Sequence, residues 1–142
     1  MGVAYSGEDP PVTVESGIPA AIRDVREAIW GLTGFALAYP VIMGVTCGGK
    51  AAVAASAQFC VAWALGLLVF GFAEGARGVR TLTLVLAIAQ AIVGWYAIGG
   101  HAPIPPAVAV VVACYSLGTT AAIVQLLRRP EVKVWFGVVR ER

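Results

Sequence analysis

Few side chains in this 142-residue sequence have the type and spacing that chemistry requires. His101 is the one histidine, and no cluster of carboxylates or cysteines accompanies it, so neither a metal site nor a histidine-activated nucleophile is expected. Cys47, Cys60 and Cys114 lack metal-ligand spacing, and we interpret them as packing residues. We therefore predict no catalytic residue, no cofactor and no metal, and we expect that the chain is not an enzyme.

Two amides are the polar side chains that stand out within long apolar stretches, Gln58 and Gln90. On neighbouring antiparallel helices they would lie at similar depth, where a hydrogen bond between them would add about 0.6–2 kcal/mol to helix packing. The preferred interpretation is structural, and the alternative is that they line a polar path or bind a headgroup. Ser116, Thr119 and Thr120 are interpreted as hydroxyls that bond back to their own helix.

The elements that carry these residues are four runs without any charge. The runs cover residues 28–49, 51–73, 81–100 and 102–127. Each reaches the roughly 20 residues that a helix needs to cross about 30 Å of hydrocarbon. The sequence therefore predicts an all-α membrane protein, a bundle of four transmembrane helices over about 28–47, 51–73, 81–100 and 107–127. Pro40 predicts a kink in the first of them.

Basic residues predict how the bundle is oriented. The membrane-orienting set is Arg77 and Arg80 between the second and third spans, with Arg128 and Arg129 after the fourth. With the basic residues of both tails, nine of the ten lysines and arginines fall on one side, and only Lys50 falls on the other. This predicts that both termini lie in the cytoplasm. The same residues flank a membrane, so nucleic-acid binding is not expected.

Small residues at every fourth position predict where helices pack. The second span contains Ala52, Ser56, Cys60 and Ala64, and the fourth contains Cys114, Gly118 and Ala122. Small residues on one face allow close helix contact in lipid. We therefore expect these faces to lie against protein, with Ser56, Cys60 and Gly118 as packing or polar-path candidates beside the two glutamines.

The chain divides into three parts. Residues 1–18 are predicted to be a flexible cytoplasmic tail, and residues 19–127 the transmembrane domain, which begins with a short interfacial helix. Residues 128–142 are predicted to form a cytoplasmic interfacial tail, in which Trp135 and Phe136 lie in the headgroup layer of an anionic membrane.

Two segments resemble the small four-span membrane proteins of actinobacteria. Residues 74–80, which follow residues 67–71, are similar to the inner loop of those proteins, and residues 126–136 resemble their shared ending. Thr81 to Thr83 stand where such proteins often have a tryptophan. The resemblance implies a bacterial plasma membrane and a four-helix fold, and it implies no activity or site.

Three functions are compatible with these features. The preferred one is a non-enzymatic accessory or assembly subunit of a larger membrane complex, because small-residue faces combine with short loops and no buried charge. The first alternative is a pore-forming or permeability protein of the phage holin or exclusion type. The second is a small-molecule transporter, which the lack of ionisable residues within the spans disfavours. The expected partners are the lipid bilayer and either other membrane subunits or further copies of the chain.

Overall fold

The computed structural model describes residues 18–96 and 104–137, and every element in this part of the chain is helical. Four helices are long: α1 (Ala20–Cys47), α2 (Gly49–Leu68), α3 (Arg77–Tyr96) and α4 (Pro106–Leu127). Two are short: the 3₁₀ helix η1 (Val69–Glu74) and α5 (Pro130–Trp135). The four long helices, with η1 continuing α2, are long and apolar enough to cross a membrane, which confirms the prediction of an all-α fold with four such helices.

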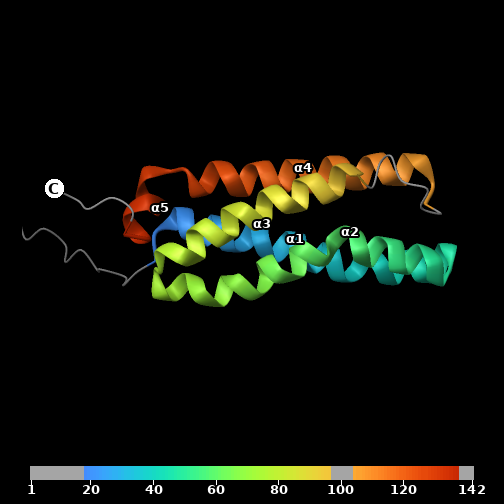
Figure 1. Ribbon diagram of the computed structural model, residues 1–142, viewed down its shortest axis with the longest axis horizontal. Helices are drawn as coiled ribbons and strands as arrows, with labels where there is room; N and C mark the ends of the chain where they lie inside the picture. The colour runs from blue at the N-terminus through green and yellow to red at the C-terminus, as the bar shows by residue number, and fades with distance from the viewer. Residues whose placement is uncertain (1–17, 97–103, 138–142) are drawn as a thin grey trace, which may run out of the picture.

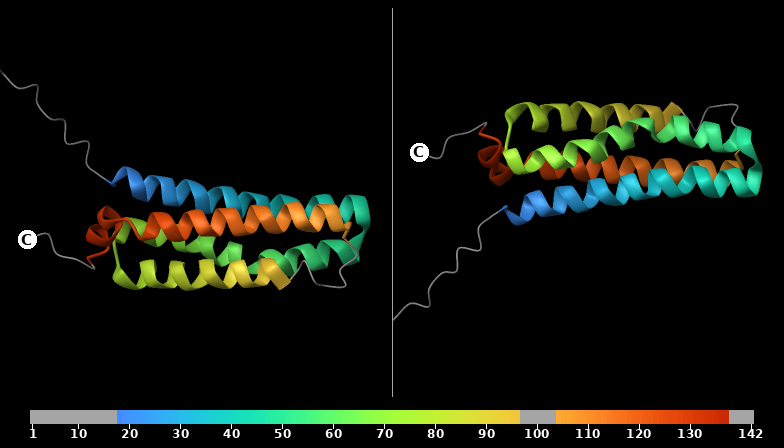
Figure 2. Two further views of the ribbon diagram at one scale, coloured as in Figure 1. Left: turned by 90° about the horizontal axis from the view of Figure 1, so that it is seen from above. Right: turned by 90° about the horizontal axis from the view of Figure 1, so that it is seen from below.

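The long helices run antiparallel in sequence order around one core (Figures 1 and 2). Helix α1 packs against α2 and α4, and α3 packs against the same two neighbours. The starts of α1 and α3 lie at one end of the bundle with the end of α4 and with α5 (Figure 1). The tight turn from α1 to α2 lies at the opposite end. Gly48 in this turn has a φ of 91°, a backbone conformation that residues with a side chain rarely adopt.

The helix boundaries differ from the predicted spans in three places. The interfacial segment before residue 28 is continuous with the first span, so α1 is a single helix of 28 residues. The second span tightens into 3₁₀ geometry from Val69 onward. Helix α3 begins at Arg77, four residues before the charge-free run. The predictions for residues 1–17, for the loop with His101 and for the last five residues lie outside the described residues.

Pro40 does not interrupt α1, because the second helix satisfies the backbone group that the proline leaves free. Proline has no N–H, so the carbonyl of Ala36, four residues earlier, loses its partner within the helix. The indole Nε1 of Trp63 on α2 donates to that carbonyl at 3.2 Å. The hydrogen bond that α1 lacks is thus replaced by one between α1 and α2.

A close approach of α1 and α2 lies one turn further toward the α5 end. Thr33 on α1 donates its hydroxyl to the carbonyl of Ile29 at 2.8 Å and to that of Ala62 on α2 at 3.2 Å. A methyl group on Gly66 would come within 2.7 Å of the Thr33 side chain. Only glycine fits this position at the observed helix separation.

Within the bundle, the small-residue faces point in directions that the sequence analysis did not expect. Cys60 and Gly118 are exposed and Ser56 is half-buried, whereas the buried face of α2 includes Ala51 and Ala55. Helix α2 is apolar on nearly all sides, and hydrophobicity does not separate a lipid-facing side from a protein-facing one. Contact of Cys60 or Gly118 with another chain stays a prediction.

One of the two aromatic rings of the predicted interfacial tail lies in the core of the bundle, while the depth of this tail in a membrane stays a prediction. Phe136 is fully buried and packs edge-to-face against Phe72, with ring centroids 5.5 Å apart. Trp135 is half-buried, and its Nε1 donates to the carbonyl of Phe72 at 3.1 Å. Helix α5 therefore packs beside η1 at the end of the core, where the rings of Phe72 and Phe136 are both buried.

Candidate functional site

The candidate site comprises a buried polar cluster and an open groove, both formed by α3 and its neighbours. The buried stripe of α3 consists of small and polar residues: Thr83, Ala87, Gln90 and Gly94. These residues recur at intervals of three and four, so they share one face of the helix. In a helix otherwise surrounded by apolar side chains, the polar residues mark the side that faces protein.

Gln90 links three helices from the centre of the bundle. Its side chain is fully buried, and its Nε2 donates to the main-chain carbonyl of Gln58 on α2 at 3.0 Å. The same nitrogen lies 3.4 Å from Oγ of Ser116 on α4. Next to this contact, a methyl group on Gly94 would come within 2.9 Å of Ser116 Oγ, so α3 and α4 approach closely. Gln90 thus holds α3 against both of its neighbours.

The two glutamines meet as expected, but through a different pair of atoms. The Gln58 side chain is buried, with 5% of its surface exposed, yet Gln90 bonds to its backbone rather than to its amide. Of the buried side-chain polar atoms in the described residues, Gln90 Oε1 and the hydroxyl of Tyr39 are the two without a hydrogen-bond partner. An unpartnered buried acceptor costs about 1–3 kcal/mol, which offsets much of what the Gln90 donor contributes.

The hydroxyls of α4 either bond back to their own helix or take part in a contact with α3. Thr119 and Thr120 donate to carbonyls of the preceding turn, those of Tyr115 and Ser116, each at 2.8 Å, which confirms their prediction. Ser116 instead accepts from Gln90. This role of Ser116 was not predicted, although its spacing of four from Thr120 places both residues on the same face of α4.

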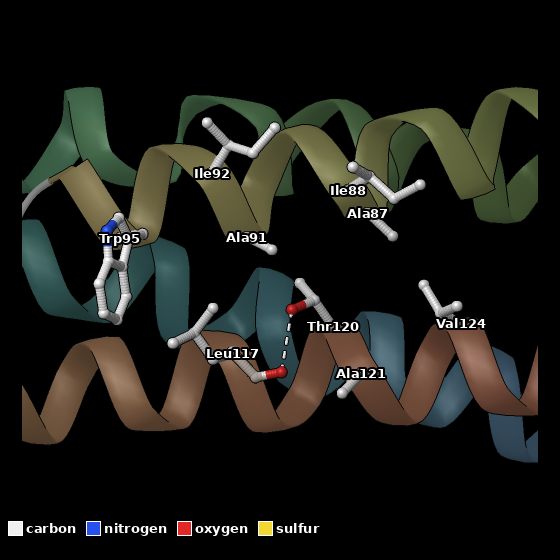
Figure 3. A pocket seen from close by; sticks show the side chains of 9 residues that line it. All are labelled: Ala87, Ile88, Ala91, Ile92, Trp95, Leu117, Thr120, Ala121 and Val124. Carbon is white, nitrogen blue, oxygen red and sulfur yellow. Dashed lines mark hydrogen bonds between the residues drawn. The ribbon is translucent and has the colours of Figure 1, made fainter.

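A groove of about 550 Å³ opens between α3 and α4 on the outer surface of the bundle (Figure 3). It is lined by Ala87, Ile88, Ala91, Ile92, Trp95, Leu117, Thr120, Ala121 and Val124. Ala87 and Ala91 of α3 point toward α4, and the Thr120 hydroxyl is already bonded to its own helix (Figure 3). Apart from the indole N–H of Trp95, the lining side chains are apolar or, like Thr120, bonded to their own helix, so the groove favours an apolar occupant.

The membrane-orienting arginines lie where the basic pattern predicts, at the end of the bundle that carries α5 (Figure 1). Arg77, Arg128 and Arg129 are exposed there. Arg80 has an additional role, because its Nε donates to the carbonyl of Leu127, the last residue of α4, at 3.1 Å. That bond satisfies one of the free carbonyls at a helix C-terminus and ties α3 to α4.

Comparison with known proteins leaves the family of the chain open. No family model, no curated protein and no solved structure matches it. The chain is therefore characterised by its own geometry, as a helical bundle with four helices apolar and long enough to span a membrane.

Proposed function

We propose that this protein is a non-enzymatic accessory or assembly subunit of a larger complex in the bacterial plasma membrane. The observation that carries the proposal is the groove between α3 and α4, which is apolar, open on the outer surface of the bundle and preformed in the single chain. Its occupant is a transmembrane helix of a partner subunit. The sequence resemblance to actinobacterial four-span proteins supports the choice of membrane.

Small residues favour a helix over lipid as the occupant. Ala87, Ala91 and Ala121 form much of the groove, and exposed Gly118 lies one turn from Ala121 with open space around it. Helices associate in lipid mainly through close packing, which such residues permit. Flexible acyl chains gain less from a fixed surface, because they lose conformational freedom when they settle on it.

Pull-down from native membranes tests the proposal. We expect the tagged chain in mild detergent to bring down one membrane protein in stoichiometric amount. Ala91→Leu and Ala121→Leu fill the groove and should each release it, because the added isobutyl groups occupy the space of the partner helix. Val53→Leu is the matched control, since Val53 is 71% exposed on α2, outside the groove. Absence of a stoichiometric partner, or its retention in both filled variants, would refute the proposal.

A pore formed by copies of the chain is the alternative, and the direction of the polar side chains disfavours it. Gln58, Gln90 and Ser116 are all buried within one chain. Large apolar side chains, among them Leu37, Val53 and Ile92, occupy the outer surface. An oligomer would thus line its channel largely with apolar groups. Membrane depolarisation on expression would nevertheless support the pore over the accessory subunit.

The cytoplasmic location of both termini is part of the proposal. Its support is the charge distribution, since Lys50 alone among the described basic residues lies at the end away from α5. In a variant without the native cysteines, Lys50→Cys should react with a membrane-impermeant thiol reagent in intact cells. Lys133→Cys should react only after permeabilisation. The reverse pattern would invert the orientation.

A further inference from the structure

A second hollow, of about 240 Å³, lies on the outer face of α1 near its start. Its lining consists of Arg23, Arg26, Glu27 and Trp30. Arg26 and Glu27 lie three and four positions after Arg23, and Trp30 lies four and three positions after them, so the set occupies one face of the helix. Two cations, one anion and an aromatic ring thus surround a single opening. The space between these side chains fits an occupant that carries both an anionic group and a cationic group.

We propose that this hollow binds the headgroup of a phospholipid that carries a primary amine, of the phosphatidylethanolamine type. The phosphate lies between Arg23 and Arg26, because guanidinium groups present paired N–H donors that match phosphate oxygens. The ammonium group lies on Glu27, to which it donates hydrogen bonds. Neighbouring positions on a helix face are about 5–6 Å apart, a distance that a headgroup with phosphate and amine two carbons apart spans.

The surface below the hollow suits the rest of a lipid. Trp30 is 45% exposed and packs edge-to-face against Phe70 of η1, with ring centroids 5.8 Å apart. Phe70 is 69% exposed, so the pair forms an apolar surface on the outside of the bundle. Indole rings favour the depth at which headgroups meet acyl chains. A lipid can therefore place its headgroup in the hollow while its chains run over the two rings.

Glu27 distinguishes this inference from the general attraction between basic residues and anionic lipid. Seven of the described basic side chains lie at this end of the bundle, and they attract anionic headgroups without selecting among them. A carboxylate within the hollow repels a purely anionic headgroup and favours one with an amine. The inference does not depend on the proposed partner helix, because the hollow lies on α1 rather than between α3 and α4.

Competition between defined lipids tests the inference. The purified full-length chain is placed in phosphatidylcholine nanodiscs with equal small amounts of phosphatidylethanolamine and phosphatidylglycerol, and bound lipids are counted by native mass spectrometry. We expect phosphatidylethanolamine to be retained about two- to fivefold over both other lipids, the effect of one partly exposed ion pair. Glu27→Gln should abolish the preference over phosphatidylglycerol. Arg23→Gln combined with Arg26→Gln should lower retention of both lipids.

Matched controls separate the hollow from the basic end as a whole. Arg129→Gln removes an exposed charge at the same end but outside the hollow, and it should leave the lipid ratio unchanged. An unchanged ratio in Glu27→Gln, or an equal loss in Arg129→Gln, would overturn the assignment. Strong competition by soluble phosphoethanolamine or inorganic phosphate would also overturn it, because the ligand would then be a small anion rather than a lipid.

Discussion

The hydrogen bond from Trp63 to the carbonyl of Ala36 predicts a measurable coupling between Trp63 and Pro40. Trp63→Phe removes the indole N–H and leaves the Ala36 carbonyl without a donor, because Pro40 supplies none. In a Pro40→Ala background, the restored backbone N–H bonds to the same carbonyl. The loss of the indole should therefore matter less in that background.

The structure sets the size of the expected effect. The bond length of 3.2 Å is at the long end of the normal range, and interhelical hydrogen bonds in membranes contribute about 0.6–1.7 kcal/mol. An orphaned carbonyl adds a penalty of about 1–3 kcal/mol. Since Trp63 is 37% exposed, its packing loss is modest and is common to both backgrounds. We expect Trp63→Phe to lower the free energy of unfolding by about 2 kcal/mol with Pro40 and by about 1 kcal/mol with alanine there.

The assay is reversible unfolding in mixed micelles, followed by far-ultraviolet circular dichroism so that tryptophan loss does not disturb the readout. The four chains of the double-mutant cycle isolate the pairwise term. Trp30→Phe in the same two backgrounds is the control, because Trp30 lies ten residues from Pro40 on α1 and should show no coupling. Equal costs of Trp63→Phe in both backgrounds would refute the compensation.

Three further predictions follow from packing and burial, each measured as the free energy of unfolding in the same mixed micelles. Gly66→Ala should destabilise the fold by about 1–3 kcal/mol because its methyl group meets Thr33, whereas Gly34→Ala, with open space around it, should not; equal effects would contradict the close approach. Gln90→Leu should change stability by at most about 1 kcal/mol, since it removes both a donor and an orphaned acceptor; a loss above about 2 kcal/mol would show that the amide oxygen has a partner. Phe136→Ala should cost about 3–5 kcal/mol as a buried ring is lost, and a negligible cost would place Phe136 at the lipid surface instead.

The four spans could be predicted from the sequence because the length of each charge-free run can be compared directly with the thickness of the bilayer. The burial of Gln58 and Gln90 could also be predicted from the sequence, because transfer of an amide side chain into hydrocarbon costs free energy unless the amide faces protein. Pro40 was correctly recognised as a missing donor, but its consequence depended on what lay opposite. The sequence could not indicate that Trp63 would lie there.

Tertiary structure decided which faces meet. The four-residue spacing in α2 suggested that the face with Cys60 packs against protein, but the bundle exposes Cys60 and buries Ala55. The sequence could not distinguish these faces, because hydrophobicity favours no side of a helix that is apolar all round. The groove between α3 and α4 and the burial of Phe136 against Phe72 likewise depend on how far apart the helices lie. Sequence alone determined that these helices are long and apolar enough to span a membrane, since length and composition are properties of the chain itself. Their contacts required the fold, because shape rather than polarity distinguishes one apolar surface from another.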